Sequence, residues 1–132
     1  MSKVKINLAC RQAGLWLPVF IWAGMLFYLS SIPNLRAVES NFWDEIIRSS
    51  AHFGFYALGY FLFFRAINFG KANLPAGRQG KNFWLPMLLT CLYALSDEIH
   101  QFFVPTRSFQ IKDLIVDFCG SGLGGLILWR LK

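Results

Sequence analysis

Ionisable side chains lie inside stretches of the chain that are otherwise apolar. Charges in such segments are costly, so they indicate a functional site by default. Carboxyl and imidazole groups serve as general acids and bases, which makes Asp97, Glu98 and His52 candidate catalytic residues. Polar side chains in or beside the same stretches are candidates for substrate binding: Gln101, His100, Arg107, Asp113, Asp117 and Tyr56.

Helical spacing would bring three of these side chains to one face of a helix. At about 100° per residue, Asp97, Glu98 and Gln101 fall within about 100° of one another. Asp97 lies about 9 Å deeper than Phe103 at about 1.5 Å per residue, too deep for a short side chain to reach water past lipid. We therefore expect Asp97 to face the interior of a helical bundle. The alternative is that these acids simply end a helix in water.

A second stripe joins acids to glycines. Asp113, Asp117, Gly120 and Gly124 lie within about 40° of one line on a helix. The Gly-x-x-x-Gly spacing lets two helix backbones approach closely, so Gly120 and Gly124 are predicted packing residues. The acids at the other end of the stripe should then point at a neighbouring helix. Alternatively, acids near a helix N-terminus can merely favour its dipole.

No common enzyme or cofactor motif accompanies these residues. HExxH, GxSxG and a phosphate-binding loop are all absent from the sequence. Cys10, Cys91 and Cys119 have the spacing of neither a disulfide framework nor a zinc site. We expect no metal ion and no cofactor.

Four apolar stretches would position the polar groups. They cover residues 13–31, 51–67, 83–104 and 111–131, each close to the roughly 20 residues that cross a bilayer. Only 15% of the residues are charged, against roughly 25% in soluble domains. We predict an all-α integral membrane protein with a single domain over residues 1–132, folded as a four-transmembrane-helix bundle. Residues 41–48, with Asn41 as their cap, are predicted to form a short interfacial helix in the first outer loop.

Basic residues predict the orientation of this bundle. The formal charge is +6, but Lys and Arg flank the apolar stretches instead of forming a stripe with interleaved aromatics, so we expect no nucleic acid as partner. Of the 13 Lys and Arg residues, four fall on the outer side of a bundle whose N-terminus is inside: Arg36, Arg48, Arg107 and Lys112. The excess on the inner side predicts a multi-pass protein of the cell membrane with both termini cytoplasmic.

The polar stretches together resemble a known family. Residues 96–107 read SDEIHQFFVPTR, and D-x-x-x-D-x-x-G-x-x-x-G follows from Asp113. This is similar to the VanZ-like family of small membrane proteins, related to the teicoplanin-resistance protein VanZ. That family has an acid-rich helix end, H-Q, an aromatic, P-G-R, and then D-x-x-x-N/D-x-x-G-x-x-x-G. Thr106 stands where the family usually has Gly, and Arg48 lies one residue before a position that often holds Lys.

The resemblance implies a link to the bacterial cell envelope, because the founding member is associated with low-level resistance to the antibiotic teicoplanin. We therefore expect an extracytoplasmic polar site that binds or modifies an anionic lipid or a lipid-linked wall precursor, with membrane lipids as partners. One alternative is an intramembrane acid/base enzyme that uses Asp97, Glu98 and His52. The other is a small cation or proton transporter, which with so few helices would need to form a homo-oligomer.

Overall fold

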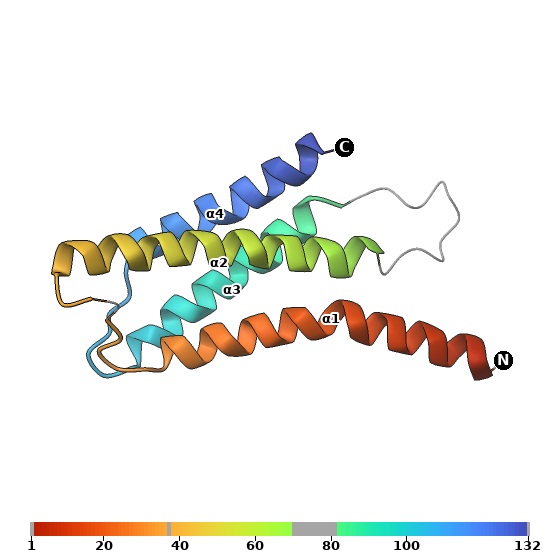
Figure 1. Cartoon of the computed structure of the whole chain (residues 1–132), viewed down its shortest axis with the longest axis horizontal. Helices are drawn as coiled ribbons and strands as arrows, with labels where there is room; N and C mark the ends of the chain where they lie inside the picture. Colours follow the sequence, from red (N-terminus) through yellow and green to blue (C-terminus); the bar gives the residue numbers. More distant parts are fainter. Residues whose placement is uncertain (1, 37, 70–81, 132) are drawn as a thin grey trace.

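The described part of the chain consists of four helices. The computed structural model describes residues 2–36, 38–69 and 82–131. Within these ranges it contains helices and no strand, as the sequence predicts: α1 (Ser2–Ser30), α2 (Asn41–Phe69), α3 (Trp84–Phe102) and α4 (Ile111–Arg130). The segments joining α1 to α2 and α3 to α4 lie together at one end, and both chain termini lie toward the other (Figure 1). We call the end with the two joining segments the polar end.

One prediction about these elements is wrong. Residues 41–48 do not form a separate interfacial helix but are the first turns of α2, which continues to Phe69. The sequence between Arg48 and Ala51 contains two serines and neither Pro nor Gly, so nothing interrupts the backbone ladder there. The apolar side chains of this first part, Phe42 and Trp43 among them, are nevertheless exposed as an interfacial segment would require.

In the described part of the chain, a single helix has the length and apolar composition of a membrane span. Residues Cys10–Ser30 of α1 are long and apolar enough to cross a bilayer, by length and composition alone. The other three helices each carry several ionisable residues, which lower their hydropathy. Some of the basic residues behind the predicted orientation lie outside the described ranges: Lys71, Arg78, Lys81 and Lys132. Four spans and their orientation therefore stay predictions.

Small residues allow the helices to approach one another. A Cβ added at Gly120 would lie 2.3 Å from the carbonyl oxygen of Phe53, and one at Gly124 would lie 2.9 Å from that of Ala57. This face of α4 therefore lies directly against the backbone of α2. On the other side of α2, the Trp22 ring fills the space above Gly59, where an added Cβ would be 2.3 Å from the ring.

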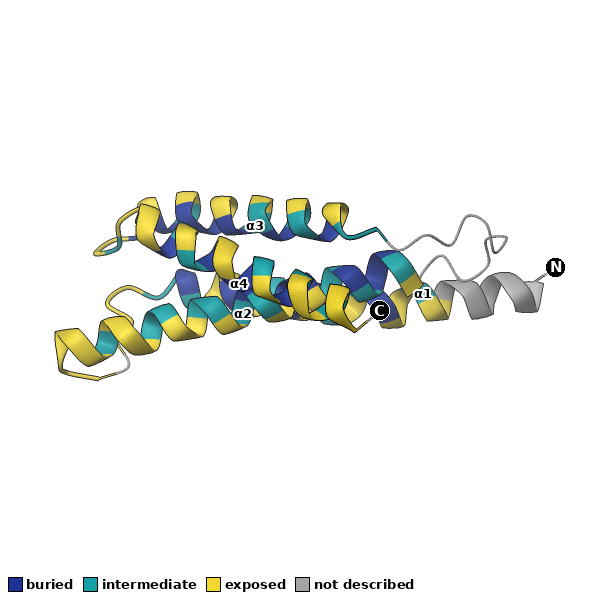
Figure 2. Cartoon of the chain, turned by 90° about the horizontal axis from the view of Figure 1, so that it is seen from above, coloured by how far each residue is buried: buried dark blue, intermediate teal, exposed yellow. Residues whose placement is uncertain are grey.

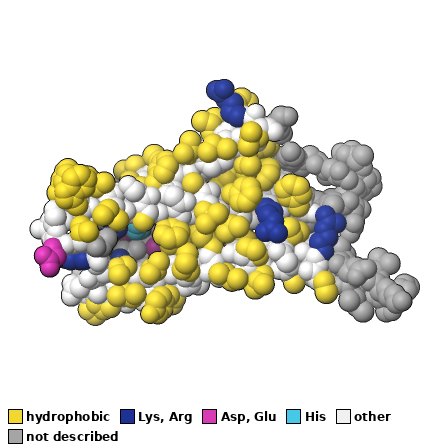
Figure 3. Space-filling model, viewed as in Figure 1, with side chains coloured by type: hydrophobic (Ala, Val, Ile, Leu, Met, Phe, Trp, Pro, Cys, Tyr) yellow, Lys and Arg dark blue, Asp and Glu magenta, His cyan; other side chains and the backbone are white. Residues whose placement is uncertain are grey.

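Many large apolar side chains are exposed and several acids are buried, the opposite of the usual arrangement in a soluble protein. Large apolar side chains face outward, including Phe20 at 68% exposure and Trp84 at 84%. By contrast, Glu98 and Asp117 are completely buried and Asp113 is 2% exposed. Figure 2 shows buried residues along the facing sides of the helices, and in Figure 3 apolar side chains cover most of the visible face. The acidic and histidine side chains visible in Figure 3 lie at the polar end.

Candidate functional site

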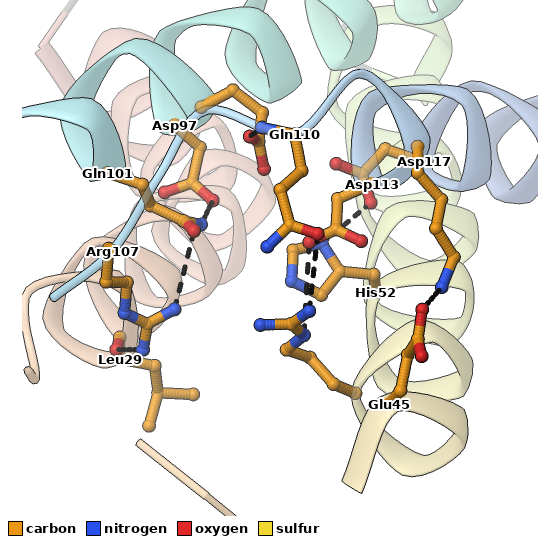
Figure 4. Close-up of polar contacts among 12 residues, drawn as sticks. Leu29, Glu45, His52, Asp97, Gln101, Arg107, Gln110, Asp113 and Asp117 are labelled. Carbon is orange, nitrogen blue, oxygen red and sulfur yellow. Dashed lines mark hydrogen bonds and ion pairs between the residues drawn. The ribbon is translucent and has the colours of Figure 1, made fainter. Parts of the chain in front are cut away.

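Most of the predicted site residues meet at the polar end of the bundle. Figure 4 shows them in two neighbouring groups, with Asp97, Gln101 and Arg107 on one side and His52, Asp113 and Asp117 on the other. We call the first the Arg107 group, which also includes Ser30. We call the second the His52 group, which also includes Arg48 and Glu98. All four helices contribute to the two groups.

The Arg107 group fixes Asp97 between two polar side chains. Ser30, at the end of α1, contacts one carboxylate oxygen of Asp97. Gln101 donates from Nε2 to the other oxygen at 3.1 Å. Gln101 lies one helical turn after Asp97, and this spacing places the two side chains side by side on α3. Asp97 is 5% exposed, in line with the expectation that it faces the bundle interior.

Arg107 itself is held by neutral acceptors. Its Nε donates to Ile32 O at 3.1 Å and its Nη2 to Leu29 O at 3.0 Å, while Nη1 lies 3.4 Å from Gln101 Oε1. Leu29 is in the last turn of α1, where carbonyls lack helical partners and a cation is favoured. A carboxylate would be the usual partner of a guanidinium in such a site, but among the ion pairs of the described residues none involves Arg107.

The charged form of Arg107 is disfavoured by burial and by a neighbouring cation. Burial lowers its pKa from the ordinary value, and the nearby Arg48 cation lowers this pKa further. A guanidinium remains protonated despite such shifts. Its charge is therefore offset only by carbonyl dipoles and by carboxylates beyond ion-pair distance.

The His52 group joins α2, α3 and α4. His52 Nδ1 is 2.9 Å from Asp117 Oδ1. Arg48 lies one turn earlier on α2, with its Nε 3.9 Å from Asp113 Oδ2. Glu98 accepts a hydrogen bond from the backbone N–H of Gln110 at 2.9 Å, directly before α4 begins. The three acids are thus brought to the same place by the α3–α4 connection and by α2.

Several buried polar atoms in and beside this group have no hydrogen-bond partner among the described residues. Within the described ranges, no hydrogen bond is made by Glu98 Oε1, Asp113 Oδ1, Asp117 Oδ2 or Tyr56 Oη, although all are buried. Buried polar atoms normally have partners, and leaving one without a partner costs about 1–3 kcal/mol. These oxygens therefore indicate that the site interacts with something besides its own side chains.

A pocket opens between α1, α2 and α3 beside the two groups. Its cavity has a volume of about 160 Å³, with apolar walls that include Leu26 and Phe55. The polar side chains that line it come from both groups: Ser30, Arg48, His52, Asp97, Gln101 and Arg107, together with Asp44. Glu98, Asp113, Asp117 and Tyr56 are buried behind this lining.

Comparison with known families settles the relationship of the chain. A family model described as VanZ/LLP1 matches residues 15–132. The chain belongs to the VanZ/LLP1 family. The matched range includes every candidate site residue of this VanZ/LLP1 protein. Neither the curated proteins nor the solved structures compared with it include a match.

The two departures from the VanZ-like pattern have visible consequences. Thr106 has a φ of 70°, which suits the glycine usual at this place, and its Oγ1 accepts a hydrogen bond from the Asn34 N–H at 3.0 Å. Arg48, displaced by one residue from the usual Lys, reaches Asp113 and lies 3.4 Å from Gln110 Oε1. A basic side chain is therefore present in the site despite the shift.

The structure also separates one predicted residue and adds others. His100 does not line the pocket: its ring stacks on Phe27 at 4.4 Å, and its Nε2 lies 3.0 Å from Ser31 Oγ. Ser30 and Arg48 line the pocket but were not among the predicted site residues. For Arg48, the family pattern was the available signal, because a nearby position often holds Lys. Ser30 carried no chemical signal of its own.

Three side chains of the VanZ/LLP1 site have the donor types of a metal centre. His52, Glu98 and Asp117 each offer a ligand atom, and these atoms lie within 4.8 Å of one another. No metal is expected from the sequence, because the three residues lie on three different helices with no motif spacing.

Proposed function

We propose that this VanZ/LLP1 protein spans the membrane with its four helices and binds the anionic headgroup of a lipid in the pocket at its polar end. The lipid is a membrane phospholipid or a lipid-linked precursor of the cell envelope. On this proposal the polar end faces outward and both termini are cytoplasmic.

The distribution of polarity supports the membrane part of the proposal. Exposed apolar side chains continue along all four helices, for example Ile21 on α1, Phe61 on α2, Leu92 on α3 and Ile115 on α4. The acids that lower the hydropathy of α3 and α4 are turned inward. A surface of this kind is stable against hydrocarbon and unfavourable against water.

Arg107 carries the headgroup part of the proposal. Its planar guanidinium suits two oxygens of a phosphate or carboxylate, and it lines the pocket without pairing with an acid. Arg48 lies in the same lining and adds a second cation. The neighbouring walls are apolar, as a lipid backbone or chain requires. Cations beside apolar walls together match an amphiphile with an anionic head.

Retention of lipid by the purified protein tests this proposal. We expect native mass spectrometry of the protein in mild detergent to show bound anionic lipid. Arg107→Ala should weaken its retention roughly 10-fold or more, the loss expected for charge-assisted hydrogen bonds. Arg107→Lys should retain part of the binding, because it keeps the charge but loses the fork.

Lys112→Ala is the matched control. Lys112 is a cation at the same end of the molecule, but it is half exposed and paired with Glu45 outside the pocket. Its loss should leave lipid retention nearly unchanged. Equal retention by wild type and a folded Arg107→Ala variant would refute the proposal, as would equal losses in the Arg107→Ala and Lys112→Ala variants. Thermal denaturation of each variant verifies that it is folded.

A further inference from the structure

The His52 group contains an unusually enclosed set of ligand-type side chains. His52 comes from α2, Glu98 from α3 and Asp117 from α4, and one donor atom from each lies within 4.8 Å of the others. Glu98 and Asp117 are completely buried. Helix packing alone would be served by apolar residues at these positions, because buried charges are costly.

Both carboxylates of this set have an oxygen without a hydrogen-bond partner. Glu98 Oε2 is occupied by the Gln110 N–H and Asp117 Oδ1 by His52, but Glu98 Oε1 and Asp117 Oδ2 have no hydrogen-bond partner in the described part of the chain. The hydroxyl of Tyr56, one turn after His52 and itself fully buried, also lacks one. These atoms together provide more acceptors than the surrounding side chains can satisfy.

The carboxyl groups in and around this set outnumber the cations. Asp113 adds a third buried carboxyl group, and the ion pair that it forms is with Arg48 at 3.9 Å, a distance at the long end for such pairs. A bound cation would be the largest local charge and would balance several carboxylates at once.

We propose that His52, Glu98 and Asp117 bind one divalent transition-metal ion, such as Zn²⁺ or Mn²⁺. One imidazole and two carboxylates form a mixed donor set that these ions accept. The 2.9 Å between His52 Nδ1 and Asp117 Oδ1 corresponds to about 90° at an ion with bonds of about 2.0–2.1 Å. Ligand atoms around tetrahedral zinc lie about 3.3 Å apart, so modest side-chain rotations would bring the third donor into contact.

The ion would have open coordination positions near the pocket. Three protein ligands leave at least one position for water or another oxygen ligand. His52 belongs both to the metal set and to the pocket lining, so the ion would lie one ligand away from the pocket. This inference goes beyond headgroup binding and does not depend on it, because the ligands are all protein groups.

Metal binding is measured on the purified full-length protein in detergent without added lipid. After treatment with a chelator, the protein is incubated with Zn²⁺ or Mn²⁺, and bound metal is determined by elemental mass spectrometry. We expect about one ion per chain and a rise in Tm of roughly 5 °C or more on metal addition. The Glu98→Gln variant should lose this ion and the rise in Tm.

Two matched controls separate a built site from adventitious binding. Glu45→Gln removes an exposed acid at the same end, and His100→Gln removes the other histidine; both variants should bind metal as wild type does. In metal-free buffer, Glu98→Gln should be at least as stable as wild type, because it neutralises a buried acid. If the Glu98→Gln variant does not fold, the His52→Gln variant is used in its place.

The inference is refuted if wild type binds neither ion, or if the Glu98→Gln and Glu45→Gln variants bind equal amounts. Its failure is distinguishable from that of the proposed function, because lipid retention is read from Arg107→Ala and metal content from Glu98→Gln. Either result can occur without the other.

Discussion

Thr106 has a backbone conformation that a β-branched residue seldom adopts. Its φ of 70° places it in the left-handed region, where the Cβ of an L-residue is crowded by the backbone. The hydrogen bond from the Asn34 N–H to its Oγ1 links the two segments at the polar end and compensates part of this strain. The turn immediately precedes Arg107, so this strain is located where the guanidinium is positioned.

We predict that glycine is better than alanine at this position. Thr106→Gly and Thr106→Ala both remove the hydroxyl, and they differ only in the Cβ. The Gly variant should therefore be the more stable by about 1 kcal/mol, the approximate cost of left-handed backbone for a residue with a Cβ. Thermal denaturation in detergent measures the difference.

Ser108 provides the comparison for this prediction. It lies in the same exposed segment, and its φ is not positive. There Gly should give no advantage over Ala, since Gly only adds freedom to the unfolded chain. If Ala equals or exceeds Gly at Thr106, the strain argument is wrong.

The partners of Arg107 show what a single sequence leaves out at the residue scale. The nearby acids would be the usual partners of a guanidinium, yet Arg107 donates to backbone carbonyls at and just after the end of α1. Every residue has a backbone carbonyl, so a sequence pattern cannot show which carbonyl will accept a hydrogen bond. The position of the α1 terminus beside the α3–α4 segment is needed to see them.

At the scale of elements, the contact between α2 and α4 is the most extensive one among the described helices. Gly120 and Gly124 lie against carbonyl oxygens of α2, so the two backbones are separated by less than an ordinary side chain requires. The same pair of helices carries the contact between His52 and Asp117. Close packing in the middle of these helices therefore sets the geometry of the site at their ends.

We predict that a single methyl group disrupts this interface. Gly120→Ala should lower the free energy of unfolding by about 1–3 kcal/mol, because the added Cβ would lie 2.3 Å from Phe53 O and backbone must move. The change should also weaken any ligand binding that depends on the His52–Asp117 contact. Thermal denaturation and the metal-binding assay measure the two effects.

Gly122→Ala is the control on the same helix. A Cβ there meets nothing within 4 Å, and alanine favours helix over glycine, so stability should be unchanged or slightly higher. Similar losses at Gly120 and Gly122 would mean that helix propensity, not contact with α2, determines the effect.

Periodicity explains why the helix faces could be predicted and the His52 group could not. The acidic stripe of α4 and the polar face of α3 follow from about 100° per residue, and Asp97, Asp113 and Asp117 are indeed buried. The meeting of His52, Glu98 and Asp117 depends on how far three helices are shifted along one another. That register is determined by interhelical packing, for example at Gly120, which one sequence alone does not specify.

At the scale of the whole molecule, the two ends differ in accessibility if the chain spans a membrane as proposed. Cys10 is exposed on α1 toward the end with the termini, and Ser108 is exposed at the polar end. We predict that a membrane-impermeant maleimide labels a Ser108→Cys variant in intact cells. Cys10 should react only after the membrane is opened.

The labelling of each position is compared in variants that retain one cysteine. Cys119 is exposed near the middle of α4 and should resist the reagent in both conditions, because lipid would cover it. Labelling of Cys10 in intact cells, with Ser108→Cys protected, would reverse the proposed orientation. Labelling of both from outside would contradict the membrane-spanning arrangement.

If the chain spans a membrane as proposed, the enclosed polar core has a consequence for how the protein is made. Among the described helices, α1 alone carries a stretch that is long and apolar enough to cross a membrane by itself. An acid at the centre of an isolated helix costs about 2.5–3.5 kcal/mol on entering the bilayer, and an acid nearer the end costs less. With Asp97 and Glu98 in its last two turns, α3 would still enter less readily alone than α1. During synthesis, α3 would therefore wait at the translocation machinery until α4 supplies its share of the polar contacts. The last helices would then enter together, so that assembly of the site and insertion of the chain become a single event.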